Sequence, residues 1–396
     1  MIYPANFEEK IGFDRIREQV TALCSTPSAK AKLAEEGFST SADEIERRLS
    51  LMNEMRSLLM LERDFPDGDY PDPAPLVAKI RVEGSYLLAA EADQLRKALV
   101  TVGAIAEFIL GRGGARYPRL WELSRRVTLF PEIVRAIDVI LDDRGEVKDS
   151  ASPELQQVRR AIREREGQAA KRLQQVLQRA KQAGIVDADA VLSVRDGRPV
   201  IPVAAANKRK LQGFIHDESA TGRTFYVEPV EVVEINNELK ELEYAERREV
   251  VKVLSTFTES IRPDAEAIAD AGDYLSSVDM IRAKARWALA NDAGKPILST
   301  DDRLELRTAR HPLLQQTLRA QGREVVPLDL ALDRRKHILV ISGPNAGGKS
   351  VCLKTTGIVQ YMFQCGFLVP TSEISELPVF ESIFIDIGDE QSIDND

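Results

Sequence analysis

The chain has 396 residues, of which 43% are hydrophobic and 30% charged, and its formal net charge is −9. This composition is typical of a globular protein with many polar helices, long enough for two or three domains, and it excludes a global electrostatic attraction to nucleic acid or membrane. The three scattered cysteines and three histidines predict neither a disulfide framework nor a zinc site, and without a signal segment or a run of about 20 apolar residues we expect a cytoplasmic protein with no membrane partner.

Residues 6 to about 150 are predicted to form successive helices. Apolar residues recur with helical spacing from Phe13 to Leu23, which indicates one buried helical face. Ser41 with Glu44 three residues later is typical of a capping box and predicts the start of another helix. Further helical stretches are expected over 85–110 and 120–141.

Two long polar helices are predicted at 153–182 and at about 230–261. Each has one narrow apolar stripe and is densely charged elsewhere, so the simplest way to bury both stripes is an antiparallel coiled coil. The segment 190–229 between them has the strand period of two, with turn signals at Asp196-Gly197 and Thr221-Gly222. We therefore expect a small antiparallel β module at the tip of a helical arm.

The β module contains a cluster of basic residues on an otherwise acidic chain. They are Arg195, Arg198, Lys208, Arg209, Lys210 and Arg223. We expect Lys208, Arg209, Lys210 and Arg223 to contact nucleic-acid phosphates. Charge alone leaves open the alternative of a solvated β surface whose charges prevent edge-to-edge pairing.

Near the C-terminal end, the chain contains a phosphate-binding loop, G-x-x-x-x-G-K-S. Its residues are Gly343, Pro344, Asn345, Ala346, Gly347, Gly348, Lys349 and Ser350. The apolar run 337–341 predicts a buried parallel strand before the loop, and 351–360 predicts a helix after it. Free backbone N–H groups and the helix dipole would face the phosphates, Lys349 would reach the β- and γ-phosphates, and Ser350 would hold Mg²⁺. The predicted ligands are ATP and Mg²⁺, since a Gly-rich turn without a ligand does not explain Lys and Ser together at the helix start.

Two observations concern the end of this region. The segment 382–386 is an apolar run that ends in Asp386, a pattern typical of a Walker B strand. Only residues 351–396 follow the loop, whereas a doubly wound domain takes roughly 150 residues or more. We therefore expect an incomplete nucleotide domain.

The motifs together resemble a known superfamily. ABC transporter ATPases have a related loop, but the order Asn345-Ala346-Gly347-Gly348 resembles the G-P-N-x-G-G-K-S of MutS proteins. Arg310-His311-Pro312 and the segment 365–370 also resemble the MutS ATPase. The segment 213–229, followed by Asn236-Asn237, looks like the second bacterial MutS paralogue, as does the segment 386–393. The resemblance covers the whole chain from Ile11 onward.

The resemblance implies a homodimeric ATPase that binds branched or duplex DNA and suppresses homologous recombination. Some members of the family instead act on collided ribosomes, contacting rRNA and splitting the subunits. Full-length members also have a C-terminal Smr domain with nuclease or nucleic-acid-binding activity. The leading hypothesis is thus a nucleotide-gated clamp, and the alternatives are a nucleic-acid-binding scaffold with a lost ATP site and an ABC-type transporter ATPase.

The fold expected from these patterns is mainly α, with a small antiparallel β clamp on a coiled-coil arm, followed by a truncated α/β P-loop ATPase domain. The expected domains are a helical core and lever at 1–152, the arm at 153–262 with its β tip at 190–229, a helical return at 263–299, and the incomplete ATPase domain at 300–396.

Departures from the family limit the expected activity. Family members are nearly twice as long, and their Walker B acid and catalytic Glu lie later, so the resemblance makes Asp386 and Glu390 interface-side residues. No complete catalytic set is expected in this chain, which we predict to be inactive alone. Phe7-Glu8-Glu9 matches the F-x-E wedge of the repair paralogue, but no mixed α/β domain surrounds it, so we interpret this match as coincidence.

Overall fold

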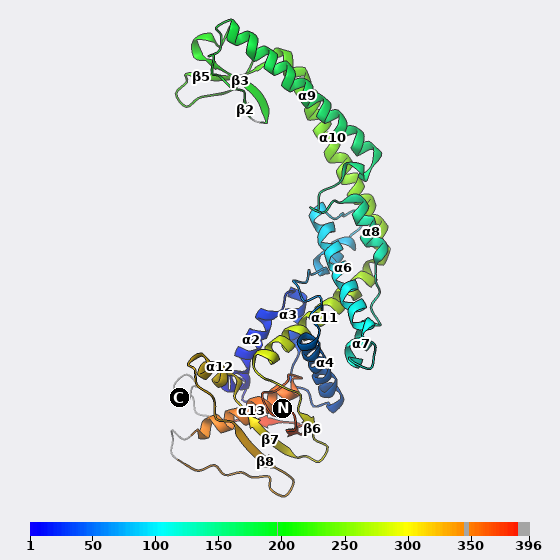
Figure 1. The fold of residues 1–396 in the computed structure, drawn as a ribbon, viewed down its shortest axis with the longest axis vertical. Helices are drawn as coiled ribbons and strands as arrows, with labels where there is room; N and C mark the ends of the chain where they lie inside the picture. The colour runs from blue at the N-terminus through cyan, green and yellow to red at the C-terminus, as the bar shows by residue number, and fades with distance from the viewer. Residues whose placement is uncertain (196, 344–347, 387–396) are drawn as a thin grey trace. The chain divides into compact units, whose positions relative to one another are not determined.

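The computed structural model describes residues 1–195, 197–343 and 348–386. The chain divides into two compact units. Figure 1 shows the helices and strands, coloured from blue at the N-terminus to red at the C-terminus. Unit 1 comprises Met1–Arg81, Gln94–Val134 and Asp264–Asp396, and unit 2 comprises Val82–Asp93 and Arg135–Pro263. The domain limits expected from the sequence stay a prediction.

Unit 1 is built around one largely buried helix, α11. Its helices are α1 (Phe7–Ile11), α2 (Phe13–Leu23), α3 (Pro27–Glu35), α4 (Ala42–Leu61), α5 (Ala74–Ile80), most of α6 (Ala89–Gly111), α7 (Pro118–Ser124), α11 (Ala265–Ala290), α12 (Pro312–Ala320) and α13 (Lys349–Gln364). Helix α11 packs against α2, α3, α4 and α5. Because α11 buries residues such as Leu275, Val278 and Trp287 on several faces, it is the central helix of this unit.

The start of α4 and the break between α7 and α8 test two helix predictions for the N-terminal region. Helix α4 begins as expected, since the Ser41 hydroxyl accepts the Glu44 N–H at 3.4 Å, although the Glu44 carboxylate accepts from the Ser39 hydroxyl instead of returning a bond to Ser41. The helical stretch expected over 120–141 is interrupted, because α7 ends at Ser124 and α8 begins at Pro131. A proline has no N–H for the helix ladder and is favoured in a first turn, so Pro131 starts a new helix.

Short strands complete unit 1. A four-stranded mixed sheet has the order β6-β9-β7-β8, and β1 pairs in parallel with β10. Their bounds are β1 (Ile2–Tyr3), β6 (Ile297–Leu298), β7 (Leu304–Ala309), β8 (Leu328–Leu332), β9 (Glu376–Leu377) and β10 (Ile383–Phe384). The buried side of α13 joins the main core, and the rings of Phe13 and Tyr361 lie 5.0 Å apart in an edge-to-face contact. The helix after the phosphate loop therefore packs directly on the first helices of the chain.

The buried strand expected at 337–341 is wrong. The structure has no strand there, and the side chains of Ile338 and Val340 are 76% and 82% exposed. A strand needs a neighbour for its backbone N–H and C=O groups, and no strand of the described residues pairs with this run. Apolar composition predicted a buried strand here, but composition cannot supply the partner strand that burial requires.

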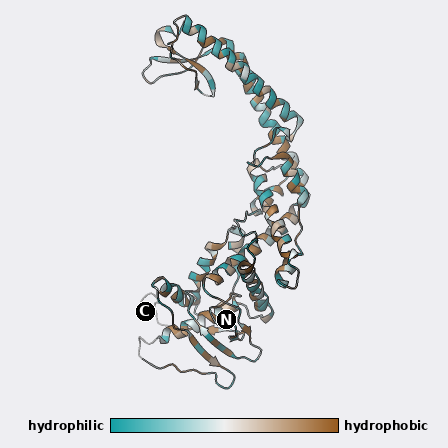
Figure 2. Cartoon of the chain, in the orientation of Figure 1, coloured by the Kyte–Doolittle hydropathy of each residue, from teal (hydrophilic) through white to brown (hydrophobic). Residues whose placement is uncertain are grey.

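Unit 2 contains two long helices that pack along each other. Its helical segments are α8 (Pro131–Ile140, mostly in this unit), the 3₁₀ turns η1 (Asp149–Ala151), η2 (Ala205–Asn207) and η3 (Arg262–Asp264), and the helices α9 (Pro153–Gln182) and α10 (Val230–Ile261). The limits predicted for α9 and α10 are confirmed. Arg159 pairs with Glu246 and Arg179 with Glu231, which makes the two helices antiparallel. In Figure 2 most of the two helices has the colour of hydrophilic residues. Coiled-coil packing between them stays a prediction.

The small antiparallel β module predicted between these helices is confirmed. Its strands are β2 (Ser193–Arg195), β3 (Arg198–Ala204), β4 (Gly213–Glu218) and β5 (Thr224–Pro229), in the order β2-β3-β5-β4. Ile201, Val203 and Val227 form a small core with residues near the end of α9. A Cβ atom at Gly213 would lie 2.1 Å from the carbonyl oxygen of Glu228, so only glycine lets the two strands approach this closely. No helix of the described residues is long and apolar enough to cross a bilayer.

Candidate functional site: the nucleotide cavity and the β module

The phosphate-binding motif lies at the start of α13. Gly348 is the residue before the helix and has a φ of 79°, a left-handed conformation that glycine adopts without strain. Lys349 and Ser350 are the first two residues of the helix, so their side chains and free N–H groups lie at its positive end. Of the predicted site residues, Pro344, Asn345, Ala346 and Gly347 lie outside the described residues.

Lys349 lies over the start of the loop. Its ammonium group donates a hydrogen bond to the carbonyl oxygen of Gly343, with 2.5 Å between the two atoms. The structure thus brings together the first glycine and the lysine of the motif, which are six positions apart in the sequence. A bound phosphate at the helix start would compete with this carbonyl oxygen for the ammonium group.

A cavity of about 610 Å³ opens beside these residues. One side is formed by the helix start, from Gly348 to Cys352, and by Thr355. Residues of α12 and of the segment before β8 form its apolar wall, next to the charged Arg323 and Glu324: Leu314, Leu318, Val325, Val326 and Pro327. Ligand pockets typically have volumes of about 300–1,000 Å³ with mostly apolar walls. The cavity could hold a base on the apolar side with its phosphates at the helix start.

The apolar wall was missed by reasoning from the sequence. A signal for it existed in the apolar run Val325-Val326-Pro327, which precedes β8. The run could be interpreted only once the fold had brought it to the same cavity as the start of α13, since residues 328–342 separate it from the phosphate loop.

His311 is a buried polar residue that lines the same cavity. Its side chain is 1% exposed, and neither ring nitrogen has a hydrogen-bond partner of good geometry among the residues that the structure describes. Burial, with the charge of Lys354 adding to it, lowers the pKa of His311 to about 4. The imidazole is therefore neutral near pH 7, and it can still donate one hydrogen bond and accept one.

The Walker B interpretation of Asp386 gains no support. The strand that precedes it, β10, pairs in parallel with β1 at the N-terminus, and Asp386 itself is exposed. Glu390 lies outside the described residues. Glu324 is the one carboxylate among the described residues that line the cavity.

In the β module, all four predicted phosphate contacts are exposed: Lys208, Arg209, Lys210 and Arg223. The N–H of Ala205 donates to the carbonyl oxygen of Arg223, which joins the basic turn after β3 to the start of β5. The Lys208 ammonium lies 4.3 Å from the centre of the Phe225 ring. No ion pair involves these four side chains in the part of the chain that the structure describes.

The other two arginines of the module have structural partners. Arg195 pairs with Asp217 at 2.9 Å and lies over the ring of Tyr226, and Arg198 binds both carboxylate oxygens of Glu228 at 2.8 and 2.9 Å. Their charges are thus largely neutralised inside the module. The basic surface is smaller than composition suggested and consists of the four exposed residues.

Glu228 is the centre of a buried hydrogen-bond network. Its side chain is 1% exposed and also accepts from Asn236 at 2.6 Å and contacts a ring nitrogen of His216 at 2.5 Å. Burial alone would raise the pKa of the Glu228 carboxyl, but hydrogen bonds from Asn236, His216 and Arg198 outweigh it and hold this pKa below its usual range. The network ties β3, β4, β5 and α10 together.

These features define a class: a mainly helical protein with a phosphate-loop cavity in one unit and a basic β module between two long antiparallel helices in the other. Residues 339–396 match the family model described as MutS domain V. The chain is 34% identical over 384 residues to Endonuclease MutS2 of Bacillus velezensis, covering 96% of this chain and 48% of that protein.

Two further relatives agree. Identity is 35% over 395 residues to Endonuclease MutS2 of Thermomicrobium roseum, covering 96% of this chain and 49% of that protein, and 34% over 384 residues to Putative endonuclease MutS2 of Bacillus subtilis, covering 96% and 48%. The chain therefore belongs to this MutS-type paralogue family. It spans about half the length of the curated relatives that it matches.

Proposed function

We propose that this chain is a nucleotide-binding, nucleic-acid-binding clamp segment of the MutS superfamily. ATP with Mg²⁺ would bind at residues 343–350, and nucleic-acid phosphates would bind at the basic end of the β module. Two protomers would close on ATP, as the family resemblance implies. The protein would act in the cytoplasm.

One observation supports the nucleotide site most directly. A 16-residue helix begins at Lys349, directly after the left-handed Gly348, and its start opens into a cavity with an apolar opposite wall. A helix start of this kind attracts phosphate through free N–H groups and the dipole. The apolar wall suits a purine base. Ser350 stands where a Mg²⁺ ligand is needed in such loops.

The nucleotide site can be tested by equilibrium binding. We expect a fluorescent ATP analogue with Mg²⁺ to bind the 396-residue chain and Lys349→Ala to weaken this binding strongly. Lys336→Ala is the matched control, because Lys336 is an exposed lysine outside the cavity. Equal affinity of both variants would refute the site.

Hydrolysis is proposed to be negligible in this chain alone. Among the described residues that line the cavity, Glu324 is the one carboxylate. It neighbours Val325 of the apolar wall in the sequence and does not belong to the phosphate loop. Losing a single charge-stabilising or positioning group commonly lowers a rate by about 10²–10³. Steady ATP turnover that disappears in Lys349→Ala would contradict this part of the proposal.

The nucleic-acid substrate is proposed from the basic β module and from the name endonuclease that the relatives have. Branched or duplex DNA, with suppression of recombination, is the first candidate. Ribosomes, with splitting of collided particles, are the second, which rests on the family resemblance. Gel shifts with a four-way DNA junction and with duplex DNA, compared with ribosome pelleting, each with and without ATP, distinguish the two.

A further inference from the structure

The turn after α6 and the helix α7 form a strongly basic segment of unit 1, here called the arginine segment (residues 111–126, Figure 1). It contains five arginines and one acidic residue, Glu122, on a chain whose net charge is −9. All five arginines are exposed: Arg112, Arg116, Arg119, Arg125 and Arg126. A concentration of one sign of charge attracts ions of the other sign even on an acidic protein. The β module belongs to unit 2, so this segment is a separate basic surface.

Two of these arginines converge on one carboxylate oxygen. Nη2 of Arg125 and Nε of Arg126 each lie 3.0 Å from Oε1 of Glu122. Hydrogen bonds from Arg125 and Arg126 lower the pKa of the Glu122 carboxyl to about 2. Both guanidinium groups are therefore already positioned to share a single oxyanion, and the pair keeps an excess positive charge because two cations meet one anion.

A second pair of arginines has the same arrangement. Arg112 and Arg116 bind the two carboxylate oxygens of Glu62, which follows α4, at 3.2 and 3.0 Å. The Glu62 side chain is 11% exposed, so this carboxylate belongs to the fold, whereas half of the Arg116 side chain faces solvent. Glu54 of α4 accepts the first backbone N–H groups of α7 at 2.9 Å, which fixes α7 against α4. The arginine segment is thus a built surface and not a loose turn.

Aromatic rings support the arginines of both pairs. The guanidinium carbon of Arg112 lies 3.8 Å from the centre of the Phe108 ring, and that of Arg125 lies 5.4 Å from the centre of the Trp121 ring. A Cβ atom at Gly114 would lie 3.2 Å from the Trp121 ring, so glycine lets the turn approach this ring closely. Stacking uses the face of a guanidinium group and leaves its N–H edge for phosphate oxygens.

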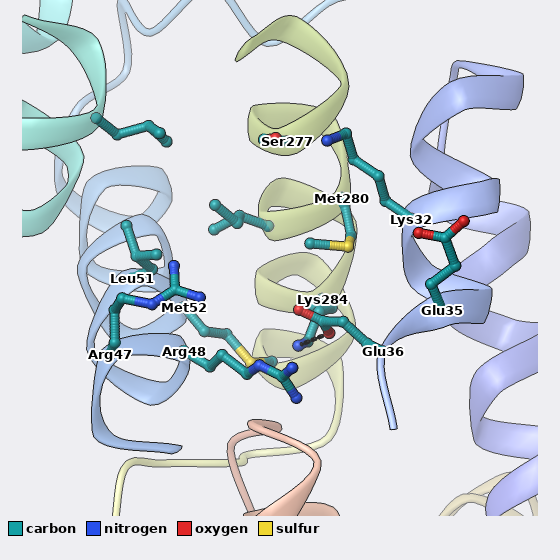
Figure 3. A pocket seen from close by; sticks show the side chains of 12 residues that line it. Lys32, Glu35, Glu36, Arg47, Arg48, Leu51, Met52, Ser277, Met280 and Lys284 are labelled. Carbon is teal, nitrogen blue, oxygen red and sulfur yellow. Dashed lines mark hydrogen bonds and ion pairs between the residues drawn. The ribbon is translucent and has the colours of Figure 1, made fainter. Parts of the chain in front are cut away.

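A different basic group in unit 1 lacks this convergence. It lines a cavity of about 330 Å³ among α3, α4 and α11 (Figure 3). Lys284 and Glu36 neutralise each other there at 2.6 Å. In Figure 3, Lys32 extends from α3 and Arg47 from α4, and their charged ends do not approach each other. Two cations held on one anion therefore distinguish the arginine segment from this cavity.

We propose that the arginine segment binds the phosphate backbone of duplex DNA, with one phosphate in the place of the Glu122 carboxylate between Arg125 and Arg126. An exposed ion pair contributes little to stability, so a phosphate can replace Glu122 at small cost. The fork of N–H donors on each arginine matches the oxygens of a phosphate. Arg116 would contact a neighbouring phosphate. The inference rests on the proposed function, because its ligand is nucleic acid, and it adds a contact in unit 1 to the one in the β module.

The test is a salt titration of duplex DNA binding by the 396-residue chain, measured by fluorescence anisotropy. Arg125→Ala/Arg126→Ala should weaken binding and reduce the slope of log K against log salt by about one unit, for the one phosphate that the pair holds. Arg334→Ala/Arg335→Ala is the matched control, because it removes another adjacent pair of exposed arginines in unit 1. This control should keep the slope of the wild type.

Replacing the shared acid should have the opposite effect. Glu122→Gln should strengthen DNA binding severalfold, because it releases both guanidinium groups for phosphate. Glu18→Gln, at an exposed position of α2, removes the same charge elsewhere in unit 1 and should leave the affinity close to that of the wild type. A purely structural role of Glu122 predicts no gain. Equal gains in the two variants would reduce the effect to net charge and overturn the inference.

The inference and the proposed function can fail separately. The arginine variants are measured in the wild type and together with Lys208→Ala/Arg209→Ala/Lys210→Ala. If only the β-module variant loses affinity, the arginine segment is a solvated surface and the inference is overturned, while the proposed function stands. If only the arginine pair matters, the inference stands and the β-module contact fails.

A competition experiment excludes an acidic protein as the partner of this surface. In the β-module variant, polyglutamate should displace a labelled duplex less well than unlabelled duplex at equal charge concentration, and equal displacement would overturn the inference. Thermal unfolding checks that each variant is folded. Arg126→Ala, at a side chain that is 73% exposed, tests the same contact if the double arginine variant unfolds.

Discussion

The backbone N–H of Ala205 donates a hydrogen bond to the carbonyl oxygen of Arg223, with 2.9 Å between the two atoms. The bond holds the turn that contains Lys208, Arg209 and Lys210 at the same end of the β module as Arg223. Four exposed cations thus share one end of a small sheet, while Arg195 and Arg198 are neutralised within it.

This arrangement predicts a nucleic-acid contact that depends on salt and not on sequence. Replacing Lys208, Arg209 and Lys210 together by alanine should weaken binding to duplex DNA and reduce the slope of log K against log salt by about one unit per lost phosphate contact. The loss should be equal for unrelated duplex sequences, because phosphate contacts do not identify bases. A salt titration of wild type and variant measures both quantities.

The matched control for this experiment removes the same charge elsewhere in unit 2. Lys171, Arg172 and Arg248 are exposed residues of α9 and α10. Their triple alanine variant should bind DNA with a slope close to that of the wild type. If both triple variants lose affinity equally, net charge alone explains binding and the β module has no special role.

The buried network around Glu228 predicts a large effect on the stability of unit 2. Glu228→Ala would leave the Arg198 guanidinium and two other donors without their acceptor, which should cost about 2–4 kcal/mol. Hydrogen exchange of the β3 and β5 amides reports this loss directly. Glu234→Ala, at an exposed position of α10, should change stability by less than about 0.5 kcal/mol. Similar protection in both variants would contradict the structural role of Glu228.

His311 predicts a pH dependence of stability. Its folded pKa is near 4, below the ordinary value of 6.5, so the unfolded chain binds a proton at higher pH than the folded one. The free energy of unfolding should therefore fall as pH decreases from about 6.5 to 4, by roughly 2–3 kcal/mol for this group. Above pH 7 the contribution of His311 should not change with pH. Chemical unfolding across pH 4–8 measures it.

The comparison variant is His311→Asn, which cannot titrate. The His311→Asn variant should lack the loss of unfolding free energy between pH 6.5 and 4 that His311 causes. His337→Asn, at an exposed position, should show the same pH dependence of unfolding free energy as the wild type. An unchanged pH profile in His311→Asn would mean that other groups cause the acid sensitivity.

Hydrogen exchange should also distinguish two parts of the region after residue 300. Amides of Ile338–Ile341 belong to no described ladder, and their side chains are exposed, so they should exchange fast. Amides of α13 at Ile358, Val359 and Phe363 lie in the main core and should exchange slowly. Slow exchange at 338–341 would show that this run has a partner strand in solution.

Much of the local structure could be predicted from the sequence. The two long helices begin and end at the predicted residues because Pro153, the apolar spacing and the turn at Gly184 act over a few neighbouring positions. The phosphate-loop motif is equally local, and its lysine and serine do begin a helix. The period of two across 190–229 predicted strands for the same reason.

Only the tertiary structure decided which of these residues are available to a ligand. Arg198 is neutralised by Glu228, 30 positions away, so its charge could not be assigned from composition. The run 337–341 has the composition of a buried strand, yet burial needs a neighbouring strand that no local signal supplies. The apolar wall at Val325–Pro327 and the buried His311 face the helix start because the chain folds back between them. Spacing within the chain determines which element forms, whereas pairing, burial and cavities depend on contacts between segments that are distant in sequence.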